Sequence, residues 1–271
     1  TSVSRGLGDV YKRQGIGCVV NTVNPRLFPE QLTYIINHAE NQYLFIDLTF
    51  VELVESLQGE LKGVKGFVIL TDRENMPDTK LANTICYEEL ISDESEDFQW
   101  PEFDENTASS LCYTSGTTGN PKGVLYSHRS TILHAWIVSS GNVAKVSSSS
   151  CILPVVPMFH VNAWGIPYAG AMFGAKLVFP GPALDGASLF ELIDNEKPDL
   201  LMGVPTVWLG LLQHLRETNQ TLDCVETALV GGSAAPRAMI QEFEEEHDVF
   251  LMHGWGMTEM SPLGTATSRT K

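Results

Sequence analysis

Short apolar runs that alternate with helix-period segments constrain the fold of this chain more than any other feature. The runs have the length and composition of buried strands. They lie at residues 43–46, 67–70, 110–113, 151–153, 177–179 and 228–230. Helix-period segments follow Pro29, Pro205 and Pro236, where proline suits the first turn of a helix. This alternation predicts an α/β fold with mostly parallel sheets flanked by helices.

Composition and charge exclude several classes of protein. The 271 residues include 33 Asp and Glu against 17 Lys and Arg, a formal net charge of -16. So acidic a chain lacks the basic surface that nucleic acids and anionic membranes attract, so we expect no nucleic-acid partner. No apolar run is long enough for an integral membrane segment. The five scattered cysteines form no C-x-x-C pair, which indicates free thiols and predicts a cytoplasmic protein.

Three stretches mark the organisation of the chain. Residues 1–14 are atypical and lack periodicity, which suggests a non-native start, and residues 15–271 carry the coherent pattern. An acidic, solvated connector is expected near 92–107, with an acidic protein-binding segment as the alternative. The C-terminus stops without a closing element, so the chain is interpreted as a fragment.

A glycine- and hydroxyl-rich loop follows the expected strand at 110–113. Its sequence is Thr114-Ser115-Gly116-Thr117-Thr118-Gly119-Asn120-Pro121-Lys122-Gly123. Glycines let backbone N–H groups approach phosphate oxygens, hydroxyls donate hydrogen bonds, and an ammonium group offsets negative charge. The loop is not a Walker A motif, because Pro121 and Gly123 replace the Gly and the Ser or Thr that flank its lysine. The pattern therefore indicates a phosphate-binding loop of another type.

This loop resembles the phosphate-binding signature of the adenylate-forming superfamily, which includes acyl-CoA synthetases, luciferases and the adenylation domains of peptide synthetases. Residues 231–236 resemble the adenine-binding turn of that superfamily. Residues 254–259 resemble its second nucleotide motif, with Trp255 where Tyr is more usual. The segments 157–164 and 203–208 are similar to the fatty-acyl-CoA synthetase branch, nearest to medium- and long-chain fatty-acid ligases and methylmercaptopropionate–CoA ligases. The resemblance covers nearly everything after Gly15.

The resemblance implies part of the large N-terminal domain of the adenylate-forming fold, without the small C-terminal domain. It also implies activation of a fatty acid by ATP to an acyl-adenylate, followed by transfer to coenzyme A. Such chemistry needs charge neutralisation and alignment more than a protein nucleophile. The implied phosphate-binding residues are Thr114, Ser115, Gly116, Thr117, Thr118, Gly119 and Lys122. Glu259 is the implied Mg²⁺ ligand, with Thr114 contributing its hydroxyl, and Thr258 would bind the α-phosphate.

The remaining implied residues surround the adenine ring and the acyl group. Trp255 would offer a flat face to adenine, although core packing is the alternative. The rest of the adenine site would comprise Gly232, Ser233, Ala234, His253 and Gly254, with His253 contributing through its backbone. His160 would lie near the carboxylate and the adenylate, and Trp164 near the mouth of the acyl tunnel. Val161 and Trp164 are also implied to bind the cofactor. If a helix starts at His160, the spacing of four places His160 and Trp164 on one face. The implied catalytic group is Lys122, His160, Thr258 and Glu259.

Two alternatives remain open. The chain could be a non-catalytic ATP–Mg²⁺ binding module, or part of a ligase for another carboxylic acid such as methylmercaptopropionate. Amino acids are disfavoured as substrates, because no acidic residue lies near His160 to meet an α-amino group. The motifs expected further along the family sequence are missing, so residues 1–271 alone should show little or no ligase activity. Uncovered apolar surface would favour association, for example as a homodimer.

Overall fold

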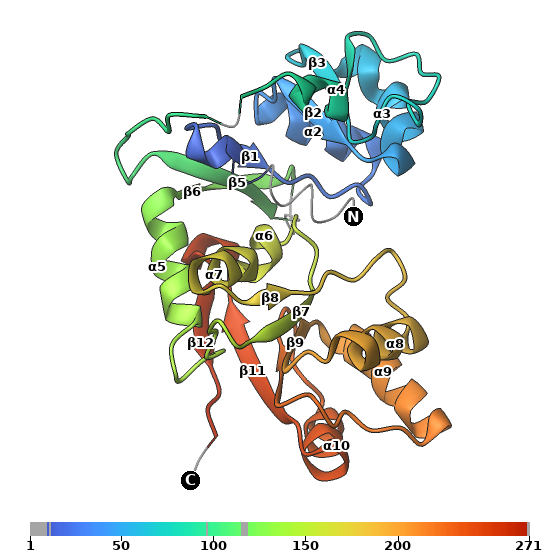
Figure 1. Ribbon diagram of the computed structural model, residues 1–271, viewed down its shortest axis with the longest axis vertical. Helices are drawn as coiled ribbons and strands as arrows, with labels where there is room; N and C mark the ends of the chain where they lie inside the picture. The colour runs from blue at the N-terminus through green and yellow to red at the C-terminus, as the bar shows by residue number, and fades with distance from the viewer. Residues whose placement is uncertain (1–9, 11, 96, 115–118, 270–271) are drawn as a thin grey trace. The chain divides into compact units, whose positions relative to one another are not determined.

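The computed structural model describes residues 10, 12–95, 97–114 and 119–269 (Figure 1). It divides into two units, Thr1–Leu125 and Tyr126–Lys271, and each is described by itself. Strands and helices alternate along the chain and most strand pairs are parallel, which confirms the predicted α/β class. Among the described residues, no helix is long and apolar enough to cross a membrane.

The first unit contains a small parallel sheet whose strands follow one another in chain order. Its strands are β2 (Tyr43–Ile46), β3 (Gly66–Ile69) and β4 (Thr84–Cys86). The helical segments around it are α2 (Pro29–His38), η1 (Leu48–Phe50), α3 (Val51–Leu57), η2 (Gln58–Glu60) and α4 (Tyr87–Ser92). The apolar stripe of α2, which includes Leu32 and Ile36, packs on Phe67 and Ile69 of β3 in one core. The expected strand at 43–46 and the expected helix after Pro29 are therefore confirmed.

A second three-stranded sheet carries the hydroxyl-rich loop. Its strands are β1 (Val20–Asn21), β5 (Ala108–Thr114) and β6 (Lys122–Ser127). The predicted strand at 110–113 lies inside β5, but β6 was not predicted. The helix that follows β6 begins at His128, with Ser127 as its N-cap. The described residues between α4 and β5 form no strand or helix and are mostly exposed, as expected for a connector. The ring of Trp100 nevertheless rests on Gly15, so the connector is not wholly solvated.

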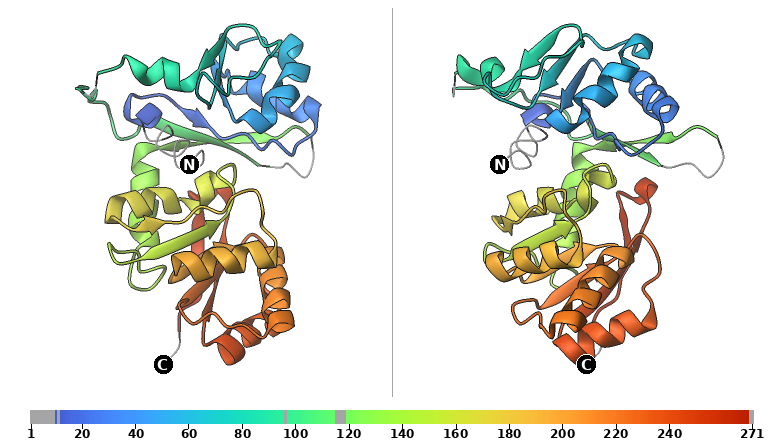
Figure 2. Two further views of the ribbon diagram at one scale, coloured as in Figure 1. Left: turned by 45° about the vertical axis from the view of Figure 1, so that its right-hand side comes forward. Right: turned by 90° about the vertical axis from the view of Figure 1, so that its right-hand side faces the viewer.

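The second unit is built on a six-stranded sheet with helices on both faces (Figures 1 and 2). Its strands, in spatial order, are β12 (Leu263–Ala266), β11 (Phe250–Gly256), β10 (Thr227–Val230), β9 (Leu200–Gly203), β7 (Cys151–Val155) and β8 (Lys176–Leu177). The helical segments are α5 (His128–Val138), α6 (Val161–Trp164), α7 (Ile166–Phe173), α8 (Gly186–Glu196), α9 (Pro205–Thr218), α10 (Arg237–His247) and η3 (Thr258–Met260). The β11–β12 pair is antiparallel and the other described pairs are parallel.

Side-chain alternation along these strands builds two separate cores. Leu201, Ala228 and Leu251 face α8, α9 and α10, where Trp208 and Phe243 are fully buried. Their chain neighbours Leu200, Leu229 and Met252 belong to the opposite core, with residues of α5, α6 and α7. Because successive side chains of a strand point to opposite faces, a strand buried on both sides must be apolar throughout. This explains why the expected strands at 151–153 and 228–230 were continuous apolar runs.

Candidate active site

The strand order of the six-stranded sheet creates a point where the chain reverses direction across the sheet. From β7 the chain moves to β8 on one side, and then returns to β9 on the other side of β7. The segment after β7 leads to α6 and α7 on one face, whereas α9 follows β9 on the opposite face. In open α/β sheets a crevice forms at the carboxyl ends of the strands at such a switch point, and ligands bind there.

The strand register aligns the carboxyl ends of four neighbouring strands. Val155 of β7 pairs with Gly203 of β9, Gly203 pairs with Val230 of β10, and Val230 pairs with His253 of β11. The segments that continue from β7, β10 and β11 hold all the second-unit residues singled out from the sequence, at 160–164, 232–234 and 253–259. The fold thus brings three separate motifs to one edge of one sheet.

Gly231 is the point where these segments touch. A Cβ atom on Gly231 would lie 3.2 Å from the carbonyl oxygen of Gly254 and 3.2 Å from Cη2 of Trp164. The next residue, Gly232, has φ +79°, a conformation that side chains other than glycine's rarely adopt. The two glycines therefore serve different needs, close approach at Gly231 and backbone geometry at Gly232. Trp164 packs against the expected adenine turn.

A left-handed backbone turn carries His160 and Trp164. The four residues Val161–Trp164 have φ between +43° and +53°, and Gly165 follows with φ +70°. The Trp164 N–H donates to the carbonyl oxygen of His160 over 3.2 Å, which closes one turn. The condition of a right-handed helix starting at His160 is therefore not met, although one left-handed turn separates His160 from Trp164. Each non-glycine residue in this conformation costs about 1–2 kcal/mol, so surrounding contacts must hold the turn.

Asn162 supplies part of that support. It is fully buried, its Nδ2 donates to the Met158 carbonyl oxygen over 3.4 Å, and its Oδ1 accepts from the Tyr168 hydroxyl over 3.3 Å. Asn is also the residue that most readily tolerates left-handed geometry after glycine. These contacts fix the turn just after His160, the residue expected at the carboxylate.

His160 itself is accessible but partly desolvated. The ring of Phe159 lies beside it, with 4.7 Å between the two centroids. Burial by neighbouring atoms lowers the pKa of His160 below its ordinary value, so the imidazole is neutral at pH 7. A neutral imidazole can donate one hydrogen bond and accept another, which suits a polar group beside a reacting carboxylate.

Trp255 lies near the end of β11, and Thr258 and Glu259 follow it in η3. Trp255 is 53% exposed, which disfavours the core-packing alternative, and one side of its ring lies against Gly264 of β12. Glu259 is exposed, within η3. The Tyr126 hydroxyl donates a hydrogen bond to the carbonyl oxygen of Thr258. Tyr126 was missed from the sequence, because nothing in the pattern of β6 separates a core tyrosine from one that orients a distant loop.

The backbone of His253 is already engaged. Its N–H donates to Oγ1 of Thr267 over 2.9 Å, and its carbonyl oxygen accepts from the Thr267 N–H over 3.0 Å. Both backbone groups of His253 thus make hydrogen bonds within the protein, and its contact with a nucleotide stays a prediction.

The hydroxyl-rich loop belongs to the first unit, and only part of it is described. Ser115, Gly116, Thr117 and Thr118 lie outside the described residues. Lys122 is exposed at the start of β6, and Oγ1 of Thr114 donates to the Lys122 carbonyl oxygen over 3.4 Å, which joins the two ends of the loop. Tyr113 bonds through its hydroxyl to Nδ1 of His38 over 2.7 Å, so α2 supports the strand that leads into the loop.

Metal-ligating side chains do not cluster in the described part of the chain. No group of three or more His, Cys, Asp or Glu side chains gathers as a metal site there. Mg²⁺ takes one or two protein carboxylates and completes its shell with phosphate oxygens and water. Glu259 is therefore a chemically sufficient protein carboxylate for a nucleotide-bound Mg²⁺.

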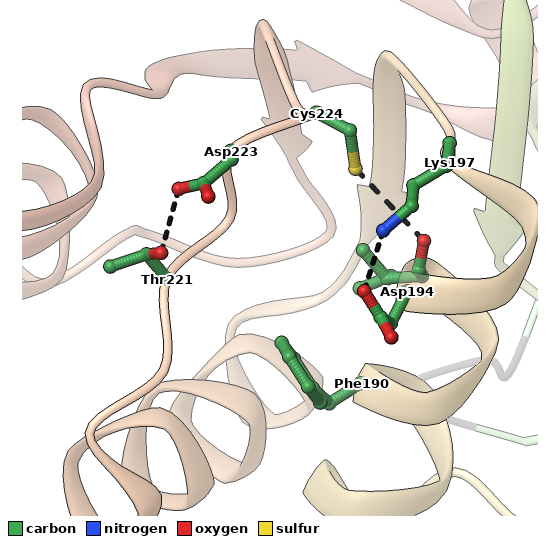
Figure 3. A pocket seen from close by; sticks show the side chains of 7 residues that line it. Phe190, Asp194, Lys197, Thr221, Asp223 and Cys224 are labelled. Atoms are coloured by element: carbon green, nitrogen blue, oxygen red, sulfur yellow. Dashed lines mark hydrogen bonds and ion pairs between the residues drawn. The ribbon is translucent and has the colours of Figure 1, made fainter.

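A hollow of about 230 Å³ lies elsewhere, beside the last turn of α8 (Figure 3). Its lining residues are Phe190, Ile193, Asp194, Lys197, Thr221, Asp223 and Cys224. Lys197 pairs with Asp194 over 2.5 Å, and burial raises the pKa of the Cys224 thiol. None of the residues expected in the site lines this hollow, and its thiol is protonated at neutral pH. It is therefore not a candidate for the active site.

Comparisons with known proteins agree with the geometry. Residues 14–271 match the family model described as AMP-binding enzyme. The chain is 52% identical over 262 residues to 3-methylmercaptopropionyl-CoA ligase of Ruegeria lacuscaerulensis, covering 97% of this chain and 49% of that protein. It is 50% identical over 264 residues to medium-chain-fatty-acid–CoA ligase of Ectopseudomonas oleovorans, covering 97% and 48%. The chain thus spans about half the length of the curated relatives it matches.

A solved structure supports the fold. The crystal structure of an anthranilate CoA ligase in complex with anthranoyl-AMP aligns with a TM-score of 0.82 at 21% identity, covering 93% of this chain and 48% of that one. The family model covers nearly the whole chain, and relatives at about 50% identity are acyl-CoA ligases. The chain belongs to the AMP-binding enzyme family.

Proposed function

We propose that the protein to which this chain belongs joins a medium- or long-chain fatty acid to coenzyme A at the expense of ATP. The observation that carries the proposal is the row formed by Val155, Gly203, Val230 and His253, which brings three motif segments to the switch point of one sheet. An oxygen of the carboxylate would attack the α-phosphorus and displace pyrophosphate. The coenzyme A thiolate would then attack the acyl carbon and release AMP.

Phosphate binding is assigned to the hydroxyl-rich loop. Lys122 would neutralise charge on the β- and γ-phosphates, with donors from the Thr114, Ser115, Gly116, Thr117, Thr118 and Gly119 positions. Tyr126, which bonds the Thr258 carbonyl, lies in the strand that begins at Lys122. Thr258 would donate to the α-phosphate, where negative charge develops as the carboxylate attacks.

Magnesium binding is assigned to Glu259, with the Thr114 hydroxyl as a second ligand, directly or through water. The ion would neutralise the phosphates and the departing pyrophosphate. Such a Mg²⁺ site needs only one or two protein carboxylates, because the nucleotide and water supply the remaining oxygen ligands. The exposed position of Glu259 supports the assignment.

Adenine and the acyl group are assigned to different segments at the aligned carboxyl ends of the strands. Trp255, half-exposed beside Gly264, offers a ring face for adenine, and Gly232, Ser233 and Ala234 would line the other side. His160, neutral at pH 7, would hold a carboxylate oxygen. Val161 and Trp164 would border the acyl chain, and Trp164 also touches Gly231 of the adenine turn.

ATP–pyrophosphate exchange tests the proposal. The assay compares octanoate, palmitate, 3-methylmercaptopropionate and phenylalanine, on the full-length protein and on residues 1–271. Exchange that depends on octanoate or palmitate and on Mg²⁺, and none with phenylalanine, is the expected result. Binding of ATP without exchange for any acid would instead identify a non-catalytic nucleotide-binding module.

A second substrate has a specific observation in its favour. The 52% identity to a 3-methylmercaptopropionyl-CoA ligase slightly exceeds the 50% identity to a medium-chain fatty-acid ligase. The ratio of kcat/KM for 3-methylmercaptopropionate and octanoate decides between the two substrates. A ratio above one would replace the fatty acid in the proposal while leaving the adenylation chemistry intact.

A further inference from the structure

The residue that follows the left-handed turn has an unusual neighbour. A Cβ atom on Gly165 would lie 2.5 Å from Nδ1 and 2.7 Å from Cε1 of His134. His134 comes from α5, an element separated from Gly165 by the whole of β7. The imidazole ring therefore occupies the space that a side chain at position 165 would need.

His134 cannot easily leave that space. Its residue is only 8% exposed, and its chain neighbour Ala135 is fully buried in the same core as Ala163 and Ile166. These residues belong to α5, α6 and α7, so the ring is enclosed by the helices on this face of the sheet. Protein interiors are close-packed, and a ring held in this way transmits displacement to its neighbours.

The enclosed ring is also uncharged. Burial lowers the pKa of His134 to about 4, so the imidazole is neutral at pH 7. It therefore acts by shape and packing. Gly165 itself has φ +70° and lies between Trp164 and the first residue of α7.

We propose that His134 is a positioning residue, whose ring packs on Gly165 and holds the left-handed turn Val161–Trp164 in place. The turn presents His160 at one end and Trp164 at the other, and Trp164 in turn contacts Gly231. The benefit to catalysis depends on the proposed function, whereas the packing of His134 on Gly165 does not. The two can therefore fail separately.

A double-mutant cycle tests the packing. Gly165→Ala in the native chain should lower the folding equilibrium constant about a hundredfold, from backbone strain together with the clash. In the His134→Ala background the same substitution should lower the folding equilibrium constant only about tenfold, because the clash is gone. Gly174→Ala is the matched control, since Gly174 has φ +73° but its Cβ would meet only Cβ of Ser148, at 3.7 Å. Gly174→Ala should lower the folding equilibrium constant about tenfold in both backgrounds.

Fluorine NMR of the 5-fluorotryptophan-labelled chain tests the positioning. The Trp164 resonance, assigned with Trp164→Phe, should shift or broaden in His134→Ala, while that of Trp208 in the other core stays in place. Gly174→Ala should move neither resonance. If Gly165→Ala lowered the folding equilibrium constant equally in the two backgrounds, the proposed packing of His134 on Gly165 would be overturned. An unmoved Trp164 resonance in folded His134→Ala would overturn the positioning role.

The catalytic consequence is measured on the full-length protein. His134→Ala should raise the KM for the carboxylic acid about tenfold and the KM for ATP by less, because the displaced turn carries His160 and touches the adenine turn only through Trp164. Unchanged kinetics together with a shifted Trp164 resonance would contradict the functional assignment of the turn, while leaving the packing of His134 established.

Discussion

The six-stranded sheet, which is parallel except for the β11–β12 pair, and the small parallel sheet formed by β2, β3 and β4 are both covered by helices, yet their carboxyl edges differ. The small sheet runs in chain order, so it has no switch point. Asp47, directly after β2, is consumed by its own turn, where Oδ1 accepts from the N–H and the hydroxyl of Thr49. The six-stranded sheet reverses between β8 and β9, and its loops hold a left-handed turn and a glycine that leaves no room for a side chain. Parallel strands alone therefore do not make a site, and strand order decides which carboxyl edge stays open.

The largest effect is expected at Glu259. Glu259→Gln should reduce Mg²⁺-dependent ATP–pyrophosphate exchange by about 10²-fold or more, because the ion loses its protein carboxylate. Glu244→Gln, at another exposed carboxylate of the same unit, is the control and should leave the exchange unchanged. The measurement is the exchange rate against Mg²⁺ concentration on the full-length protein. Equal rates in the two variants would remove Glu259 from the site.

The next effect is on stability and comes from His134. Its folded pKa of about 4 lies below the value of 6.5 for an exposed histidine, so the unfolded chain binds more protons between these pH values. The favourable contribution of the neutral ring is complete above pH 6.5 and is lost as the pH falls toward 4. From pH 7 to pH 5 this amounts to about 2 kcal/mol. In denaturant titrations, the free energy of unfolding should fall from pH 7 to pH 5 by about 2 kcal/mol more in the native chain than in His134→Ala. The same fall in both chains would show that His134 is not buried.

Gly→Ala substitutions at two crowded glycines, Gly231 and Gly66, allow the two sheets to be compared directly. A Cβ on Gly231 would meet the Gly254 oxygen at 3.2 Å, and a Cβ on Gly66 in the small sheet would meet the Asn83 oxygen, also at 3.2 Å. Both Gly→Ala variants should lose about 1–2 kcal/mol of stability. Only Gly231→Ala should weaken AMP binding, about tenfold, as measured by equilibrium dialysis. Equal losses of affinity would mean that the effect is general and not local to the switch point.

The smallest effect belongs to the small sheet. Asp47→Ala removes the side chain that caps η1 and should cost about 1 kcal/mol of stability. AMP affinity should stay within twofold, because the carboxyl edge of this sheet is closed by its own turns. Chemical denaturation and equilibrium dialysis measure the two quantities. A loss of affinity comparable to that of Gly231→Ala would contradict the distinction between the sheets.

Elements with a strong local signal were predictable from the sequence. The strand at 43–46 and the helix from Pro29 were found because apolar spacing and proline position are local properties. β6 was missed because its sequence, Lys122 to Ser127, mixes polar and apolar residues without clear alternation. The strand expected at 177–179 is shorter and earlier, at Lys176–Leu177, because Phe179 already lies in the loop toward α8.

The sequence predicted the motif segments of the second unit as a group, but it did not predict their backbone geometry. Motif resemblance grouped residues 160–164, 231–236 and 254–259, and the strand register explains why they share an edge. The left-handed turn escaped prediction because Val161, Ala163 and Trp164 are residues that avoid positive φ in isolation. The packing of His134 on Gly165 escaped as well, since it depends on helix packing between segments thirty residues apart.

Hydrogen–deuterium exchange with and without Mg²⁺–ATP tests the central claim most directly, because it reads every loop at once. Nucleotide-dependent protection is expected in residues 114–122, 231–234 and 254–259, and none in the turns after β2 and β3. Protection of the small sheet's turns instead, or protection of 231–234 without any change at 114–122 and 259, would contradict the assignment of one nucleotide to these loops.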